Sequence, residues 1–347
     1  MMTSKPYSQI SVQPRGAAGF TLVELMIALV LGLLVVAGVG SVFLANQTAY
    51  RSNVALGEVQ EGARTSFEFL AREIRAAGAN PCGTSNVASV LNPGGNAMLY
   101  DNAPIQGWDD ATTVAALPPS APGLPVAGGG DAIRLASAKG SGLDLEAVTG
   151  PRANVKLNSS TTAISAEDIL MLCDIDKATI FQVTNYNSSN RTVVHGTGQV
   201  KTGPGNQTKC LDHPVPMQPG SGVDCSSFSP TSYLAIPVNY IWYIGTNSDG
   251  GRSLFRFGWG GGASSEPMEM VRGVWNMTAR YHEQGGNAYV TATNVGNWDN
   301  VDAVRLMLTV QSGGTQPGNA AGAGTDNQPL QRTFTSTVAI RNRLNIN

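Results

Sequence analysis

One acidic residue, Glu24, stands at the entrance to a long apolar stretch of the chain, and no formal charge follows between Leu25 and Tyr50. A carboxylate inside hydrocarbon is costly unless a cation neutralises it, so the chemistry predicted for this residue is ion pairing. A cut between Gly19 and Phe20 would create such a cation, an α-amino group four residues before Glu24, on the same chain or on a neighbouring copy. The alternative is a plain membrane anchor in which Glu24 lies among the lipid headgroups.

The stretch after Glu24 is long enough to cross a membrane once. The 21 residues of Leu25–Ala45 would span roughly 32 Å as a helix, which matches the ~30 Å hydrocarbon core of a bilayer. The preceding residues contain Lys5 and Arg15 and no acidic residue before Glu24. This charge distribution predicts that the N-terminus stays inside and that the C-terminus lies outside.

Residues 19–24, Gly-Phe-Thr-Leu-Val-Glu, followed by this apolar stretch, resemble the type III signal of type IV prepilins and pseudopilins. In that family a prepilin peptidase cuts after the Gly and N-methylates the Phe. The resemblance implies that Gly19 precedes the cut, that Phe20 is the methylated N-terminus and that Glu24 is the assembly carboxylate. The leader is longer than many in the family, and the apolar segment lacks the helix-kinking proline that major pilins often have.

Several strings farther along the chain are similar to PilW-type minor pilins and, more loosely, to the J-type pseudopilin of type II secretion. They are RTSFEFLAREIRAAGANPC (64–82), VRGVWNMTARYH (271–282), NWDNVDAVRLMLTVQS (297–312) and RTFTSTVAIRNRL (332–344). The resemblance touches both ends of the chain, whereas residues 83–230 are similar to no family that we can name.

This resemblance implies an α+β, type IV pilin-like fold with a long N-terminal helix packed on an antiparallel β-sheet head. Residues 1–19 would form the cleaved leader and 20–50 the transmembrane and assembly half of the helix. Residues 51–78 would form the amphipathic half of the helix, and 79–347 a periplasmic, β-rich head with long loops.

The residue pattern supports one continuous helix of about 58 residues, ending at Gly78 before Pro81. No proline occurs between Phe20 and Asn80. In the second half, apolar residues recur mostly every three or four positions and predict one buried stripe. The stripe consists of Val54, Leu56, Val59, Ala63, Phe67, Leu70 and Ile74.

The remainder of the chain reads as short strands between turns rich in Gly, Asn and Asp. Low-complexity loops are expected at 83–130, 198–230 and 312–329. The expected strands are Ala132–Ala136, Thr179–Thr184, Thr192–His195, Val238–Ile244, Ser253–Phe257, Val271–Tyr281, Ala288–Thr293, Val301–Gln311 and Arg332–Arg341.

Four cysteines, Cys82, Cys173, Cys210 and Cys225, follow the membrane segment. In an oxidising periplasm an even number predicts two disulfides, and the sequence allows three pairings. We favour Cys82–Cys173 with Cys210–Cys225, because the second bond would tie down the loop-rich 198–230 region. The alternative is free buried thiols.

Composition and motifs argue against an enzyme. Lys and Arg number 22 against 24 Asp and Glu, without a basic cluster, so no nucleic-acid partner is expected. No G-x-S-x-G, H-E-x-x-H or P-loop occurs, and no cofactor or metal is expected. The three histidines, His195, His213 and His282, are far apart in the sequence. Acidic turns at 174–176 and 299–302 lack EF-hand spacing and are interpreted as solvated turns.

The family resemblance implies a minor pilin that primes type IV pilus assembly and enters the pilus near its tip. Expected partners are the prepilin peptidase, other minor pilins, the major pilin and the inner-membrane assembly platform, and could include a tip adhesin. The protein would cross the inner membrane once, with a cytoplasmic N-terminus, and then reach the pilus and cell surface. The alternatives are a J-type pseudopilin of type II secretion and a membrane-tethered periplasmic binding protein or adhesin.

Processing gives the first prediction. Mass spectrometry of the membrane-extracted protein should find a chain that begins with N-methylated Phe20. A chain that keeps its leader, or one cut after Ala45, would contradict the resemblance.

Overall fold

The computed structural model describes residues 19–341 apart from 80, 85–86, 93–102, 119, 121, 149–153, 199–200, 202, 212–227, 230, 261–262, 265 and 314–327. The expected leader therefore lies outside the described residues except for Gly19. The chain divides into two compact units, Met1–Arg51 and Ser52–Asn347. An α+β architecture results, with one long helix and sheets that are mainly antiparallel.

The helix α1 runs from Leu22 to Ala76, 55 residues, close to the predicted length. It ends where the sequence indicated, because Gly78 adopts a positive φ of 72° that stops helical propagation. The Gly78 amide then donates to the carbonyl of Ala136, 2.8 Å away, so the chain leaving the helix is bonded directly to a strand of the head.

The second half of α1 buries one stripe of its surface. Within it Val59, Ala63, Leu70 and Ile74 are buried as predicted, and Phe67 is partly buried against the same core. Val54 and Leu56 were wrongly assigned to the stripe, since they are 37% and 39% exposed and Ala55 between them is buried. The inward face also includes small residues that a search for large apolar side chains overlooks. Its buried members are Ala55, Val59, Ala63, Ser66, Leu70, Ala71 and Ile74.

Two sheets form the head, counted over the described residues. A 12-stranded sheet has the path β1-β6-β5-β9-β3-β4-β8-β7, with β10 also on β9, β2 on β3, and β11 and β12 on β10. Its strands are β1 (Val87–Ser89), β2 (Ile105–Trp108), β3 (Ala132–Val148), β4 (Val155–Leu157), β5 (Ile169–Cys173), β6 (Ala178–Gln182), β7 (Asn185–Asn187), β8 (Thr192–Val194), β9 (Tyr233–Thr246), β10 (Arg252–Gly260), β11 (Ala263–Ser264) and β12 (Met268–Arg272).

The second sheet has four strands in the order β14-β13-β15-β16. They are β13 (Val274–Glu283), β14 (Tyr289–Val290), β15 (Val301–Gln311) and β16 (Gln331–Ala339). Three 3-10 turns complete the described structure, at Ala111–Thr113, Ala292–Asn294 and Trp298–Asn300.

The strand predictions succeed where apolar and polar residues alternate, as in β15, whose bounds match the expected ones. The expected strand Val271–Tyr281 is instead two strands in two sheets, because Gly273 has a φ of 77° and turns the chain between β12 and β13. The expected strand Ala288–Thr293 is shorter in the structure, where it consists of β14 followed by a 3-10 turn. The strand β5 was missed because all five of its residues are buried, which leaves no alternation to detect.

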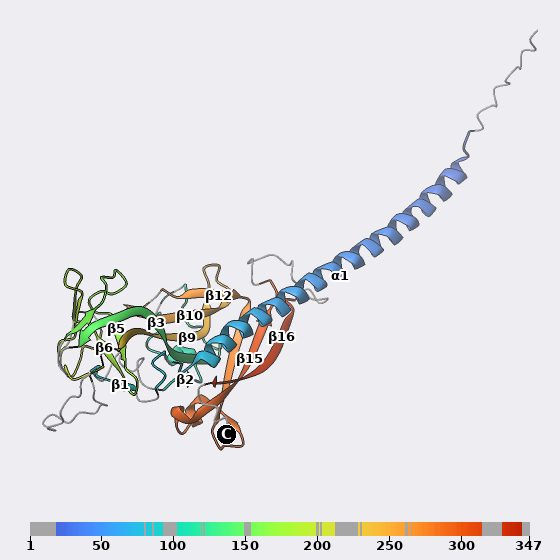
Figure 1. Ribbon diagram of the computed structural model, residues 1–347. Helices are drawn as coiled ribbons and strands as arrows, with labels where there is room; N and C mark the ends of the chain where they lie inside the picture. The colour runs from blue at the N-terminus through green and yellow to red at the C-terminus, as the bar shows by residue number, and fades with distance from the viewer. Residues whose placement is uncertain are drawn as a thin grey trace, which may run out of the picture. The chain divides into compact units, whose positions relative to one another are not determined.

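The main core lies between the second half of α1 and both sheets. Figure 1 shows this part of the helix against β15, and buried residues of β3, β9, β10, β13, β15 and β16 join the same cluster. Neighbouring residues of β9 belong to different cores, since Trp242 and Ile244 join the cluster of the helix while Ile241 and Tyr243 join a second cluster. Successive residues of a strand point to opposite faces, so the large sheet is covered on both sides here.

Burial of α1 should control the stability of the head. Leu70→Ala removes a fully buried side chain and should lower the free energy of unfolding by about 3 kcal/mol, because it leaves a cavity between helix and sheets. The matched control is Leu56→Ala, at a residue of the same helix that is 39% exposed. It should lower the free energy of unfolding by less than about 1 kcal/mol. Denaturation of the full-length protein in detergent measures both, and equal losses would contradict the packing described here.

Candidate processing and assembly site

The first turn of α1 is closed by a reciprocal cap between Thr21 and Glu24. The Thr21 amide and hydroxyl both donate to Glu24 Oε2, each over 3.0 Å, and the Glu24 amide donates to Thr21 Oγ1 over 3.3 Å. The Thr21 carbonyl accepts the first helical hydrogen bond, from the Leu25 amide at 3.1 Å. This is the capping box, in which the threonine is the N-cap and the acid is three residues later.

The cap explains how a carboxylate can stand at the start of an apolar helix. The first amides of any helix have no partner within it, and polar groups without partners are costly in hydrocarbon. Here one carboxylate oxygen satisfies the Thr21 donors, while no described residue bonds Glu24 Oε1. Glu24 was predicted from its place before the apolar stretch, whereas Thr21 was not, although the T-x-x-E spacing was a usable signal.

The side chains that follow the cap are exposed and apolar. Phe20 is 90% exposed, and the large apolar side chains from Leu22 to Leu44 are each more than half exposed. Within the described part of the chain, α1 alone has the length and apolar composition of a membrane span. In water such a surface would be costly, so the segment requires a lipid or protein environment.

Two family models match the chain. Residues 14–40 match the prokaryotic N-terminal methylation motif, and residues 241–342 match the type IV pilus-assembly protein W family. Together they fit a type IV minor pilin of the PilW family.

The PilW match extends over β10 to β16 and the end of β9, which supply most of the head residues that share a core with α1. Residues 41–240 lie outside both matches. No curated protein and no solved structure matches the chain. The resemblance read from the N-terminal signal and the C-terminal strands is thus confirmed by two independent matches. The methylation-motif match covers Gly19, Phe20 and the capped turn.

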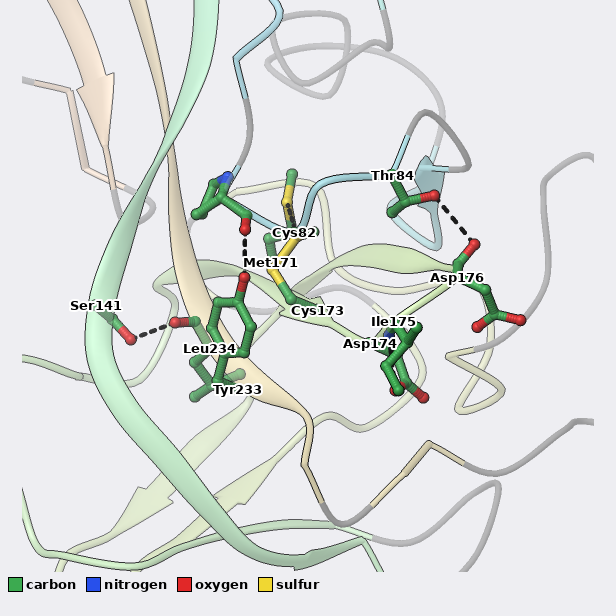
Figure 2. Close-up of a disulfide and its surroundings, with 11 residues drawn as sticks. Cys82, Thr84, Ser141, Met171, Cys173, Asp174, Ile175, Asp176, Tyr233 and Leu234 are labelled. Carbon is green, nitrogen blue, oxygen red and sulfur yellow. Dashed lines mark hydrogen bonds between the residues drawn. A yellow bond between two sulfur atoms is a disulfide. The ribbon is translucent and has the colours of Figure 1, made fainter.

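The predicted disulfide Cys82–Cys173 is present and joins the segment after α1 to the end of β5 (Figure 2). Beside it, the Tyr233 hydroxyl at the start of β9 donates to the carbonyl of Pro81. The disulfide and this hydrogen bond hold the chain that leaves the helix against the large sheet. They therefore fix where the amphipathic half of α1 ends on the head.

The second cysteine pair is only partly described. Cys210 is disulfide-bonded, whereas its expected partner Cys225 lies outside the described residues. The Cys210–Cys225 pairing therefore stays a prediction.

The histidines lie in separate environments. His195 follows β8 in the large sheet and packs edge-on against Phe181, while His282 lies on β13 of the smaller sheet. The ring nitrogen Nδ1 of His282 is 2.6 Å from Asp302, and this hydrogen bond raises the pKa of the histidine. His213 lies outside the described residues.

The acidic turns are bonded within the protein. Asp174 accepts hydrogen bonds from the amide and hydroxyl of Ser229, and Asp302 is paired with His282. Among the described residues, no group of three or more His, Cys, Asp or Glu side chains is arranged to hold a metal ion.

One buried acid, Asp131, lies between the start of β3 and β13. It accepts hydrogen bonds from the Ala279 amide at 2.7 Å and from Arg280 at 3.3 Å. Burial outweighs these bonds and raises the pKa of Asp131 to about 6. The folded protein consequently holds this proton more tightly than an unfolded chain, in which an Asp has a pKa of about 3.9.

The contribution of Asp131 to stability should be largest below about pH 4 and should be lost as the pH rises through about 6. The variant Asp131→Asn lacks this titration. The difference between its free energy of unfolding and that of the wild type should therefore shrink as the pH rises from about 4 to 7, by at most about 3 kcal/mol. The control Asp110→Asn removes an acid whose pKa is lowered by a hydrogen bond from the Thr112 hydroxyl. The stability that Asp110 contributes is present above about pH 4 and is lost only at lower pH, so the deficit of this variant should stay nearly constant from about pH 4 to 7. Urea unfolding across this pH range measures the free energy of unfolding of both variants, and a constant deficit for Asp131→Asn would contradict the assignment.

Proposed function

We propose that this minor pilin primes type IV pilus assembly and is incorporated near the pilus tip. The supporting observation is the coincidence of three features at one place. The methylation-motif match, the Thr21–Glu24 cap and the start of an exposed apolar helix all fall within the first turns of α1. A structural subunit needs nothing more at its N-terminus, and we infer no catalytic activity.

In the proposed mechanism, the prepilin peptidase cuts after Gly19 and methylates Phe20. The cut converts the Gly19–Phe20 peptide nitrogen into a cationic amine next to the capped turn. Glu24 keeps Thr21 in place through Oε2 and offers Oε1 to the Phe20 amine of a neighbouring subunit. A charge-assisted hydrogen bond in a low-dielectric surrounding is stronger than one in water, so the pair would set the register between subunits.

The apolar helix would then exchange lipid for neighbouring helices. The exposed side chains of Leu22–Leu44 supply the surface for both environments. Because Lys5 and Arg15 precede the span, we infer that the head lies in the periplasm and reaches the cell surface with the filament. The proposed partners are other minor pilins, the major pilin and the inner-membrane assembly platform.

Substitution of Glu24 tests this function. In Glu24→Ala the chain should still be cut and methylated at Phe20, whereas its amount in sheared pili should fall at least tenfold because the amine loses its counter-ion. Glu68→Ala, an exposed acid on the same helix, should leave incorporation unchanged. Immunoblots of sheared pili and of membranes measure both variants.

Normal incorporation of Glu24→Ala would contradict the proposal. Deletion of the whole chain distinguishes a priming pilin from a J-type pseudopilin. Loss of the priming pilin should abolish surface pili, whereas loss of a J-type pseudopilin should abolish protein secretion.

A further inference from the structure

A cavity of about 320 Å³ opens where the last turns of α1 meet the large sheet. Its polar walls come from four elements that are distant in the sequence. The helix supplies Arg72 and Glu73, β3 supplies Ser137 and Lys139, β9 supplies Tyr240, and β10 supplies Arg256.

The Tyr240 ring is held in place by its neighbours. It lies opposite Gly258 in the sheet register, and a Cβ on Gly258 would come within 2.7 Å of the ring. The Arg256 guanidinium lies over the ring at 4.5 Å from its centroid, and Lys139 lies at 5.8 Å with Nζ 3.4 Å from the hydroxyl. The ring is thus a wall that fixes the positions of two cations.

The one acid of the cavity is already engaged. Glu73 accepts a hydrogen bond from Trp242 Nε1 at 2.7 Å through one oxygen and from Arg256 at 3.1 Å through the other. No carboxylate of the described residues lies within ion-pair distance, 4.0 Å, of Arg72 or Lys139. With three cations and one committed acid, the cavity holds an excess of positive charge.

This excess contrasts with the protein as a whole. Removal of residues 1–19 takes away Lys5 and Arg15 and leaves 20 basic residues against 24 acidic ones. The cavity is therefore a local positive site on a net negative chain. Its size and its two available cations suit one compact anion, whereas a polyanion such as nucleic acid would need an extended basic surface.

We propose that this cavity binds the carboxylate of an Asp or Glu side chain from another pilus subunit. The proposal rests on the function proposed above, since it needs a neighbouring subunit. Arg72 and Lys139 would hold the carboxylate from opposite elements, and a desolvated charge pair of this kind fixes the orientation of an interface. Contact with Gly258 and Arg256 leaves the Tyr240 ring little free face for stacking a sugar.

Photo-crosslinking in piliated cells tests the proposal. Ser137 lines the cavity without contributing charge, so benzoylphenylalanine at this position of the full-length chain should crosslink to another pilin. Mass spectrometry should place the crosslink beside an Asp or Glu of that subunit. The same amino acid at Ile175, 82% exposed in the turn between β5 and β6, should not yield that crosslinked peptide.

Reversal of the two cavity charges is the second part of the test. Arg72→Glu with Lys139→Glu should reduce the Ser137 crosslink at least tenfold, whereas Arg72→Lys should keep it. The matched control, Lys201→Glu with Lys209→Glu, reverses two exposed lysines elsewhere and should also keep it. Exchange of the identified partner acid for Arg should restore crosslinking to the doubly reversed chain. Equal melting temperatures of the purified variants show that the head is folded.

Three results would overturn the inference. They are an unchanged crosslink in the doubly reversed chain, a crosslink to carbohydrate rather than protein, and the absence of any Ser137 crosslink in a chain that is processed at Phe20 and incorporated. In each of these cases the minor-pilin function would stand. Failure of processing itself would instead overturn the proposed function.

Discussion

Between its ends, a continuous helix satisfies its own backbone hydrogen bonds in lipid as in water, so the side chains decide what each part of α1 can contact. The rest of the structure depends on this division of α1 by its side chains. The first half exposes apolar side chains all round and suits a surrounding of lipid or of other helices. The second half exposes charge on one side and buries Val59, Leu70 and Ile74 on the other. One element thereby meets two different surroundings without a break in its backbone.

The N-terminal turn shows how a charged group can be placed in such a helix. Thr21 and Glu24 form hydrogen bonds with each other, and these leave the second carboxylate oxygen, Oε1, without a partner among the described residues. The cap therefore reconciles two requirements, a closed helix end and an acid able to pair with a cation. Both are met by residues three positions apart, inside the segment that matches the methylation motif.

At its other end the helix is tied to the head by several short links. Gly78 turns the chain onto β3, and the Cys82–Cys173 disulfide holds it to β5. Gly273 then carries the chain from the large sheet into the four-stranded sheet, so both sheets can cover the same helix face. The cavity of Arg72 and Lys139 is lined by the last turns of this helix and by β3, β9 and β10.

Sequence alone determined the features that depend on local pattern. The apolar span, the match of residues 14–40 to the methylation motif, the end of α1 near Gly78 and the alternating strand β15 follow from residues close together in the chain. The strand β5 and the division of Val271–Tyr281 between two sheets could not be predicted in this way. Burial on both faces erases alternation, and a single positive-φ glycine redirects a strand without changing its composition.

Tertiary structure decided the remainder because it brings together residues that are distant in the chain. Cys82 meets Cys173, and Glu73 meets Trp242 and Arg256, only after the helix has packed on the sheets. The sequence offered three cysteine pairings and no sign that Glu73 has a partner. Local pattern specifies which elements form, whereas the packing of apolar faces specifies which polar side chains then become neighbours.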